Sequence, residues 1–164
     1  MPKLLNLGCG EDIRKSVNGY EWINHDLHPR EGVDKAWNLE ETPLPWPDNF
    51  FDLVNASHVL EHIQNLIPLM KELHRILVPS GILTVYVPHF SCRAAIADPT
   101  HVRQFTPETF YHFVHDGKLG FDTSGCSGLF KLAWLEVITH KKGELDYDGP
   151  GSYFTEIMAE LEKR

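Results

Sequence analysis

The sequence is short of cysteine, of positive charge and of long apolar runs. Its three cysteines, Cys9, Cys92 and Cys126, fit neither a disulfide framework nor a paired zinc motif, so we expect a reducing compartment. No apolar run approaches the roughly 20 residues of a membrane span, and no basic-then-apolar leader begins the sequence. These absences predict a cytoplasmic protein with no membrane partner.

Basic residues are outnumbered, because 15 lysines and arginines stand against 23 acidic residues, for a formal net charge of -8. No long basic run could neutralise a phosphate backbone, which argues against a nucleic-acid partner. What is present is a 42% hydrophobic composition over 164 residues, without internal repeats or low-complexity segments. This predicts one domain over residues 1–164.

An apolar run near the start ends in two glycines. Leu4, Leu5 and Leu7 predict a buried parallel strand, and Gly8 and Gly10 predict a tight turn after it. Because glycine has no β-carbon, the main chain of such a turn can approach a ligand to contact distance. The turn is therefore a candidate cofactor floor, and a plain turn is the alternative reading.

A second predicted strand, residues 20–26, ends in a carboxylate. In nucleotide-binding parallel sheets, an acid about 20 residues past the glycines accepts hydrogen bonds from a ribose hydroxyl. Asp26 stands in that place. An aspartate that caps a strand or a turn is the alternative.

Further strands are predicted by apolar runs bounded by turn residues, at 33–39, 50–56, 82–87 and 130–139. The tail, 153–164, is ambiguous between a helix and an antiparallel strand that pairs with the sixth, and we favour the strand. Strands that alternate with helical segments predict right-handed crossovers and a mainly parallel sheet covered on both faces.

Two helices have clear sequence signals. From Leu66 onward apolar residues recur at helical spacing, and Pro79, Ser80 and Gly81 are expected to stop that helix. A second helix is predicted to start at Thr106 and Pro107, with threonine as the N-cap and proline in the first turn.

Together, five blocks of sequence resemble the class I S-adenosylmethionine-dependent methyltransferases, in the branch called methyltransferase type 11. The blocks are residues 4–10, Asp26, residues 47–54, residues 59–63 and residues 77–83. The resemblance implies an α/β, Rossmann-like fold with a mainly parallel sheet, an antiparallel last strand and helices on both faces. It also implies S-adenosyl-L-methionine as cofactor and S-adenosylhomocysteine as product.

Carried over position by position, the resemblance implies a set of cofactor-binding residues that follow the first four strands. They are Asn6, Leu7, Gly8, Cys9, Gly10, Asp26, Leu27, Asn38, Leu39, Ser57 and His58. The set departs from the family at Asn6, where many members carry an acid.

Residues 89–128 interrupt the alternation and are expected to form a substrate-side insertion between strands five and six. Histidines suit a general base and arginines suit an anionic acceptor. The candidate catalytic residues are His89, Asp98 and His101, and the candidate substrate-binding residues are Ser91, Arg93 and Arg103. Alternatively, Asp98, His101 and Arg103 tie a long loop together by hydrogen bonds.

His58 and His62 stand four apart with Glu61 between them, so they could share one helix face as zinc ligands do. The run lacks the glutamate next to the first histidine of the HExxH zinc pattern, so we expect no metal.

The sequence therefore predicts an enzyme that methylates a small polar or anionic molecule. A nicotinamide-dependent oxidoreductase is the alternative enzyme, because a glycine turn and a strand-end acid serve any adenosine cofactor. A non-catalytic module that binds an adenosyl cofactor within a complex is the other alternative, and a homodimer is left open.

Overall fold

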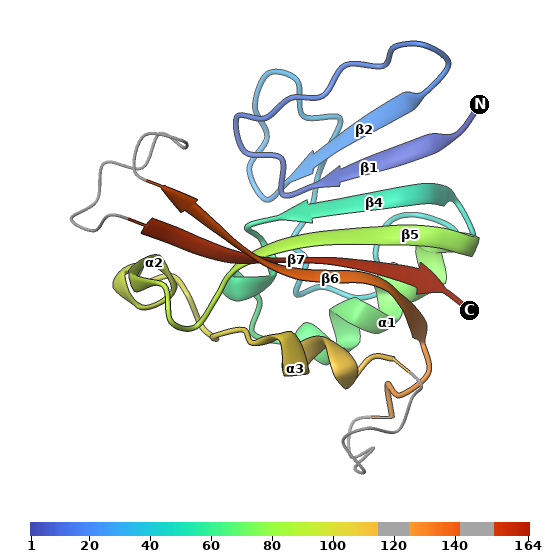
Figure 1. The fold of residues 1–164 in the computed structure, drawn as a ribbon. Helices are drawn as coiled ribbons and strands as arrows, with labels where there is room; N and C mark the ends of the chain where they lie inside the picture. Colours follow the sequence, from blue (N-terminus) through green and yellow to red (C-terminus); the bar gives the residue numbers. More distant parts are fainter. Residues whose placement is uncertain (115–124, 142–152) are drawn as a thin grey trace.

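The computed structural model describes residues 1–114, 125–141 and 153–164, and its frame is one seven-stranded sheet (Figure 1). The strands are β1 (Lys3–Leu7), β2 (Glu21–Asp26), β3 (Lys35–Ala36), β4 (Phe51–Ser57), β5 (Leu77–Pro88), β6 (Phe130–Lys141) and β7 (Tyr153–Lys163). Their order in the sheet is β3-β2-β1-β4-β5-β7-β6. Of the predicted insertion, residues 115–124 lie outside the described ranges.

The sheet is parallel from β3 to β5, and β7 pairs antiparallel with both β5 and β6. This confirms the predicted Rossmann-like fold and the strand favoured for the tail. The third strand is shorter than predicted, with two residues in place of 33–39.

The longest helix is α1 (Leu66–Ile76), and it buries Leu66, Leu69, Met70, Leu73 and Ile76 as its spacing predicted. The predicted stop at residues 79–81 is wrong. The carbonyl of Ile76 accepts the N–H of Phe50 at 2.7 Å, and Leu77 already pairs with Phe51 as the first residue of β5. Strand pairing therefore ends the helix before the proline does.

Three short helical segments complete the described structure: η1 (Leu60–His62), α2 (Arg93–Ala97) and α3 (Pro107–Tyr111). In α3 the side chain of Thr106 accepts a bond from the backbone of Thr109, and the Thr109 hydroxyl accepts the N–H of Thr106 at 3.2 Å. This capping box confirms the helix start predicted at Thr106.

One face of the sheet carries the core. Leu5, Leu7, Val54 and Val85 have no exposed surface, and they belong to the same buried cluster as the apolar side of α1. Each side chain of this size stabilises the fold by about 1.5–3 kcal/mol relative to an exposed position.

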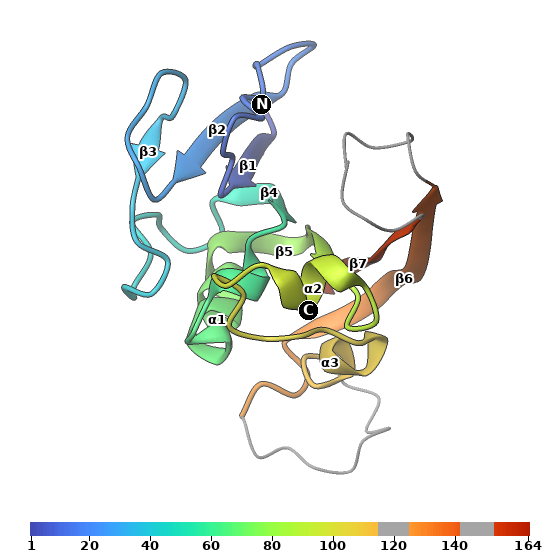
Figure 2. The ribbon, with the colours of Figure 1, turned by 90° about the vertical axis from the view of Figure 1, so that its left-hand side faces the viewer.

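The opposite face carries a ladder of asparagines. Asn6 Nδ2 donates to Asn24 Oδ1 at 3.2 Å, and Asn55 Nδ2 donates to Asn6 Oδ1 at 3.4 Å. Figure 2 shows α1 and α3 on the same side of the sheet, and the described segments that join β1 to β2 and β2 to β3 contain no helix. Tight turns with positive φ at Gly10 and Gly19 replace the helices that the resemblance implied on this face.

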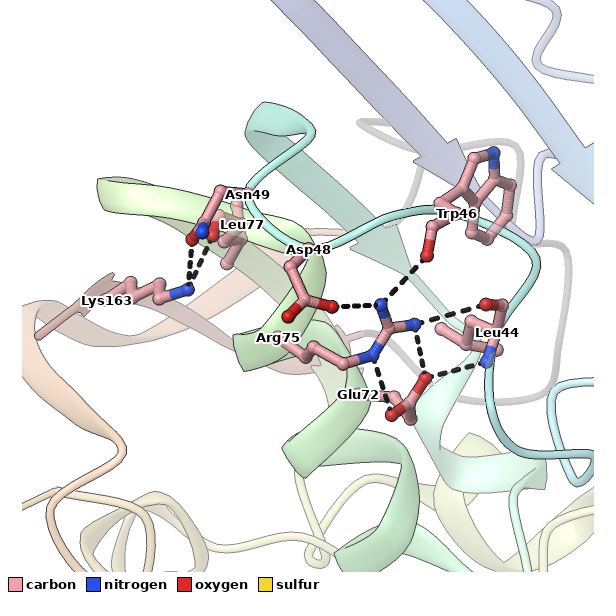
Figure 3. Close-up of polar contacts among 8 residues, drawn as sticks. All are labelled: Leu44, Trp46, Asp48, Asn49, Glu72, Arg75, Leu77 and Lys163. Carbon is pink, nitrogen blue, oxygen red and sulfur yellow. Dashed lines mark hydrogen bonds and ion pairs between the residues drawn. The ribbon is translucent and has the colours of Figure 1, made fainter.

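The proline-rich loop after β3, residues 42–49, is held by one arginine (Figure 3). Arg75 Nη1 donates to the carbonyl of Trp46 and to Asp48 Oδ1, at 2.9 and 2.8 Å, and Nη2 donates to the carbonyl of Leu44 at 3.1 Å. Glu72 accepts from Nε and Nη2 of Arg75 and from the N–H of Leu44. The side-chain bond from Arg75 lowers the pKa of Glu72, although burial acts in the other direction.

Among the described residues, no helix is long and apolar enough to cross a membrane. All three cysteines lie within the described ranges and are buried, and none forms a disulfide.

Candidate functional site

A cavity of about 340 Å³ lies at the carboxyl edge of β1, β2 and β4, the edge that Figure 2 turns toward the viewer. Ligands bind at this edge in open α/β sheets. Its lining residues are Gly8, His25, Asp26, Leu27, Trp37, Asn38, Leu39, Glu40, His58, Val59, His62 and Ile63. Six of the predicted cofactor-binding residues are therefore placed together: Gly8, Asp26, Leu27, Asn38, Leu39 and His58.

The turn after β1 requires glycine at residue 8. Gly8 has φ 63°, and a β-carbon built there would lie 2.3 Å from Cγ2 of Val59. A side chain at this position is thus excluded both by the backbone and by its neighbour. The main chain of Gly8 forms part of the cavity wall.

His25 is a site residue that the sequence analysis missed. Its Nδ1 accepts the N–H of Gly8 at 3.3 Å, so its Nε2 carries the proton and donates to the carbonyl of Trp37 at 3.0 Å. The ring is 1% exposed, and this burial lowers its pKa and keeps it neutral. His25 therefore fixes the glycine turn to the segment after β3. A polar residue just before the strand-end acid was its only sequence signal.

Asp26 is bound to the same turn. Its Oδ2 accepts the N–H of Gly10 at 2.9 Å, and its Oδ1 accepts the N–H of His28 at 3.0 Å and Nη2 of Arg30 at 3.1 Å. Partial burial alone would raise the pKa of Asp26, but these donors lower it overall. A carboxylate has about four acceptor sites, so Asp26 keeps capacity for a ligand hydroxyl.

Apolar side chains form the walls of the cavity beside Asp26. Leu27 is 54% exposed, an unusual state for leucine, while Leu39 and Ile63 are nearly buried. Such walls suit a flat aromatic group that stacks between them.

Other predicted cofactor residues are not part of the cavity lining in the described chain. Asn6 is 2% exposed, and its amide is used by the asparagine ladder and by a bond to the carbonyl of Asp12 at 2.6 Å. Leu7, Cys9, Gly10 and Ser57 are also outside the lining. Gly10 acts through its bond to Asp26.

His58 follows β4 with φ 53°, and its ring lies between two carboxylates. Nε2 is 3.2 Å from Glu156 Oε2, and Nδ1 is 3.4 Å from Glu61 Oε1. Burial would lower the pKa of His58, but these carboxylates raise it to about 9. Glu156 also bonds His140 Nε2 at 2.6 Å. No local sequence pattern pointed to His140 or Glu156 as site residues. They reach the site from β6 and β7, respectively.

Two of the predicted catalytic residues bond mainly within their own segment. His89 Nδ1 lies 2.7 Å from Ser91 Oγ, directly after β5. Asp98 Oδ1 accepts the N–H and the hydroxyl of Thr100, at 2.8 and 2.6 Å, which lowers the pKa of Asp98. Both lie in the segments that follow the carboxyl end of β5, where the acceptor is expected, and neither lines the cavity.

Arg103 fastens the loop after α2 to the segment after η1. Its Nε and Nη2 donate to the carbonyl of Ile63 at 3.0 and 2.7 Å, and Nη2 also donates to the carbonyl of Gln64 at 2.6 Å. These bonds match the loop-tying alternative and use donors that the substrate-binding prediction needed. Arg93 is exposed at the start of α2.

Sequence comparison finds a family described as a methyltransferase domain, whose match covers residues 25–85. A protein of Mycolicibacterium smegmatis named "Probable S-adenosylmethionine-dependent methyltransferase" is 27% identical over 158 residues. The match takes in 85% of this chain and 60% of that relative, so the chain spans about three fifths of the relative's length.

Solved structures share the fold. An S-adenosylmethionine-dependent methyltransferase from Archaeoglobus fulgidus aligns with a TM-score of 0.64 at 18% identity, over 99% of this chain and 86% of that one. A structure titled as the [4+2]-cyclase SpnF aligns with a TM-score of 0.65 at 18% identity, over 99% of this chain and 74% of that one. At these identities the likeness establishes the fold alone.

Proposed function

We propose that this chain, a class I S-adenosylmethionine-dependent methyltransferase domain of the type 11 branch by sequence match and fold, binds S-adenosylmethionine in the cavity and methylates a small polar or anionic molecule. The observation that carries the proposal is the bond from Gly10 N–H to Asp26 Oδ2, which joins the glycine turn to the strand-end acid beside one cavity. Because a solved structure of the same fold is titled as a cyclase, the reaction itself rests on the sequence match.

The residues present fit this cofactor. Gly8 has no side chain and lines the cavity with main-chain atoms, so a ligand there meets backbone groups. Asp26 would accept the ribose hydroxyls, and Leu27 and Leu39 would hold the adenine between them.

When bound, S-adenosylmethionine supplies an electrophilic methyl group on a sulfonium whose leaving thioether is neutral. Positioning and exclusion of water are therefore the main tasks of the chain. The loop after α2 suits this work because the N–H of Val102 donates to the carbonyl of Glu61 at 2.9 Å, which brings the loop beside η1 and the cavity.

The acceptor would lie on the side of the predicted insertion. His89, Asp98 and His101 are the candidate groups that orient it or take its proton, and Ser91, Arg93 and Arg103 are the candidate contacts to a polar or anionic part. His101 lies close to the cavity, since its ring centroid lies 4.8 Å from that of His62, a lining residue.

Titration calorimetry tests the cofactor. Wild-type protein is expected to bind S-adenosylmethionine and S-adenosylhomocysteine but not NAD, and Asp26→Asn is expected to weaken both adenosyl ligands by about 10–100-fold, the loss of charged hydrogen bonds. Asp52→Asn is the matched control, because Asp52 is exposed at the other end of β4, where it accepts the N–H of Lys3. Folded wild-type protein that binds neither adenosyl ligand contradicts the proposal, and NAD binding that depends on Asp26 favours the oxidoreductase.

An acceptor screen tests the reaction. Release of S-adenosylhomocysteine is measured with panels of small carboxylates, neutral polar molecules and amines at equal concentration. Turnover with members of the first two panels is expected. Turnover confined to protein or nucleic acid would contradict the substrate class.

A further inference from the structure

A carboxylate and two imidazoles meet beside the cofactor cavity. Glu61, His62 and His101 each offer one potential ligand atom, and these atoms all lie within 4.8 Å of one another. Glu61 and His62 come from η1, and His101 comes from the loop after α2. The cluster is thus built by two segments far apart in the sequence.

The fold holds these two segments together by several bonds. Besides the bond from Val102 N–H to the carbonyl of Glu61, the guanidinium of Arg103 binds the carbonyl of Ile63 through Nε and Nη2. The residues on both sides of the cluster are therefore fixed, and His101 is presented to η1 by a tethered loop.

Glu61 is the observation that points to a ligand. Its side chain is 1% exposed, and neither carboxylate oxygen has a hydrogen-bond partner among the described residues. The nearest cation is His58, whose Nδ1 lies 3.4 Å from Oε1 without hydrogen-bond geometry. A buried carboxylate is costly unless it is paired or coordinates a metal. His58 supplies a charge beside Oε1, but the hydrogen bonds that would complete the pairing are absent among the described residues.

The two histidines are oriented in the way that metal ligands usually are. Nδ1 of His62 lies 3.0 Å from Thr100 Oγ1, and Nδ1 of His101 lies 3.3 Å from the carbonyl of Ala95. A proton on each Nδ1 satisfies these acceptors and leaves the lone pair of each Nε2 available. Metal-bound histidines almost always donate their other ring N–H in this manner.

We propose that Glu61, His62 and His101 bind a divalent transition-metal ion, with zinc the ion that two imidazoles and one carboxylate suit best. In a tetrahedral site, ligand atoms about 2.1 Å from the ion lie about 3.4 Å from one another, so the observed separations of up to 4.8 Å must close by about 1.4 Å through side-chain rotation. Asp98 Oδ2, which is 3.8 Å from His101 Nε2, is a second carboxylate oxygen close to the cluster.

This site revises the sequence-based expectation that no metal is bound. That expectation considered His58 with His62, whereas the structure engages His58 with Glu156 and supplies the second imidazole from residue 101. Because His62 also lines the cofactor cavity, the ion would lie at the cavity rim. Three protein ligands leave an open coordination position, as in catalytic zinc sites.

The test uses full-length protein without a histidine tag, stripped by chelator and titrated with Co²⁺ and with Zn²⁺. Wild-type protein is expected to take up one ion per chain, with visible d–d absorption for Co²⁺ and a matching calorimetric titration for Zn²⁺. His101→Ala and Glu61→Gln, checked for folding by circular dichroism, are expected to weaken binding by at least about 100-fold, more than the loss of an outer-shell partner causes. His112→Ala is the matched control, since His112 is exposed at the end of α3.

Thr100→Val gives an intermediate case, because it removes only the hydroxyl beside His62 Nδ1, and it should weaken binding by about 10-fold. Folded wild-type protein that binds neither ion, or binding unchanged in His101→Ala and Glu61→Gln, overturns the proposal. These measurements need no S-adenosylmethionine, so their failure and the failure of the proposed function are told apart.

Discussion

Charged side chains at the amino ends and at the carboxyl ends of the parallel strands differ in how completely they are hydrogen-bonded. At the amino edge of β4 and β5, Arg75 donates to four groups, and Lys163 donates to Asn49 Oδ1 at 2.8 Å and to the carbonyl of Leu77 at 2.7 Å (Figure 3). At the carboxyl edge, both oxygens of Glu61 lack a hydrogen-bond donor in the described chain. Charged groups whose hydrogen bonds are all made within the chain support the fold. A buried charged group without hydrogen-bond partners indicates where a ligand would bind.

Residues that stabilise the fold and residues that could bind a ligand lie at opposite ends of the strands. The contacts of Arg75 are made to its own helix and to the proline-rich loop, so they need nothing from outside the chain. Asp26 lines the cavity and, although it accepts three donors, retains about one acceptor site. Variants at the two edges should therefore fail in different assays.

The largest effect is expected from Gly8→Ala, at the carboxyl edge. The added β-carbon collides with Val59 and must adopt φ 63°, so we expect binding of S-adenosylhomocysteine to be lost, together with a destabilisation of at least about 1–2 kcal/mol. Calorimetry and thermal unfolding measure the two effects. Gly19→Ala is the matched control, because Gly19 has φ 83° but no atom within 4 Å of an added β-carbon. Normal affinity in Gly8→Ala would refute the assignment of the cavity.

Arg75→Ala should act at the amino edge alone. It removes several hydrogen bonds of a partly exposed guanidinium, so we expect the free energy of unfolding to fall by about 2 kcal/mol, with unchanged affinity for S-adenosylhomocysteine. Urea denaturation measures the loss. Lys131→Ala, which breaks a pair with Glu162 in which the lysine side chain is 61% exposed, should cost under about 0.5 kcal/mol. An equal loss of unfolding free energy in Arg75→Ala and Lys131→Ala would contradict the view that the bonds of Arg75 stabilise the fold more than an exposed ion pair does.

An effect smaller than that of Arg75→Ala is expected at Glu72, in the form of a pH dependence. Its pKa is lower in the folded chain than the ordinary value of 4.5, so the paired carboxylate stabilises the fold above pH 4.5 and loses this effect as the pH falls below it. At pH 7 the free energy of unfolding of wild type should exceed that of Glu72→Gln by about 1 kcal/mol. In acid the two free energies should become equal. Urea denaturation at several pH values checks this. A difference that is constant with pH would show that charge is not the cause.

Local sequence was enough to predict that Gly8 and Asp26 lie close together, and the structure places both in the lining of one cavity. A tight turn and a strand-end carboxylate are set by neighbouring residues. The predicted end of α1 was wrong because the N–H of Phe50 captures the carbonyl of Ile76, a contact between distant segments. The tautomer of His25, with the proton on Nε2, likewise depends on the carbonyl of Trp37, beyond the strand that carries it.

The sequence by itself determined the order of the strands, the presence of α1 and α3, the glycine turn and the acid beside it, because periodicity and backbone freedom are local properties. Only the tertiary structure decided which polar groups share a space. Glu156 reaches His58 because β7 pairs with β5, and His101 reaches Glu61 because Val102 bonds to η1. Contacts of this kind depend on strand register and loop closure across many residues, and no local pattern records them.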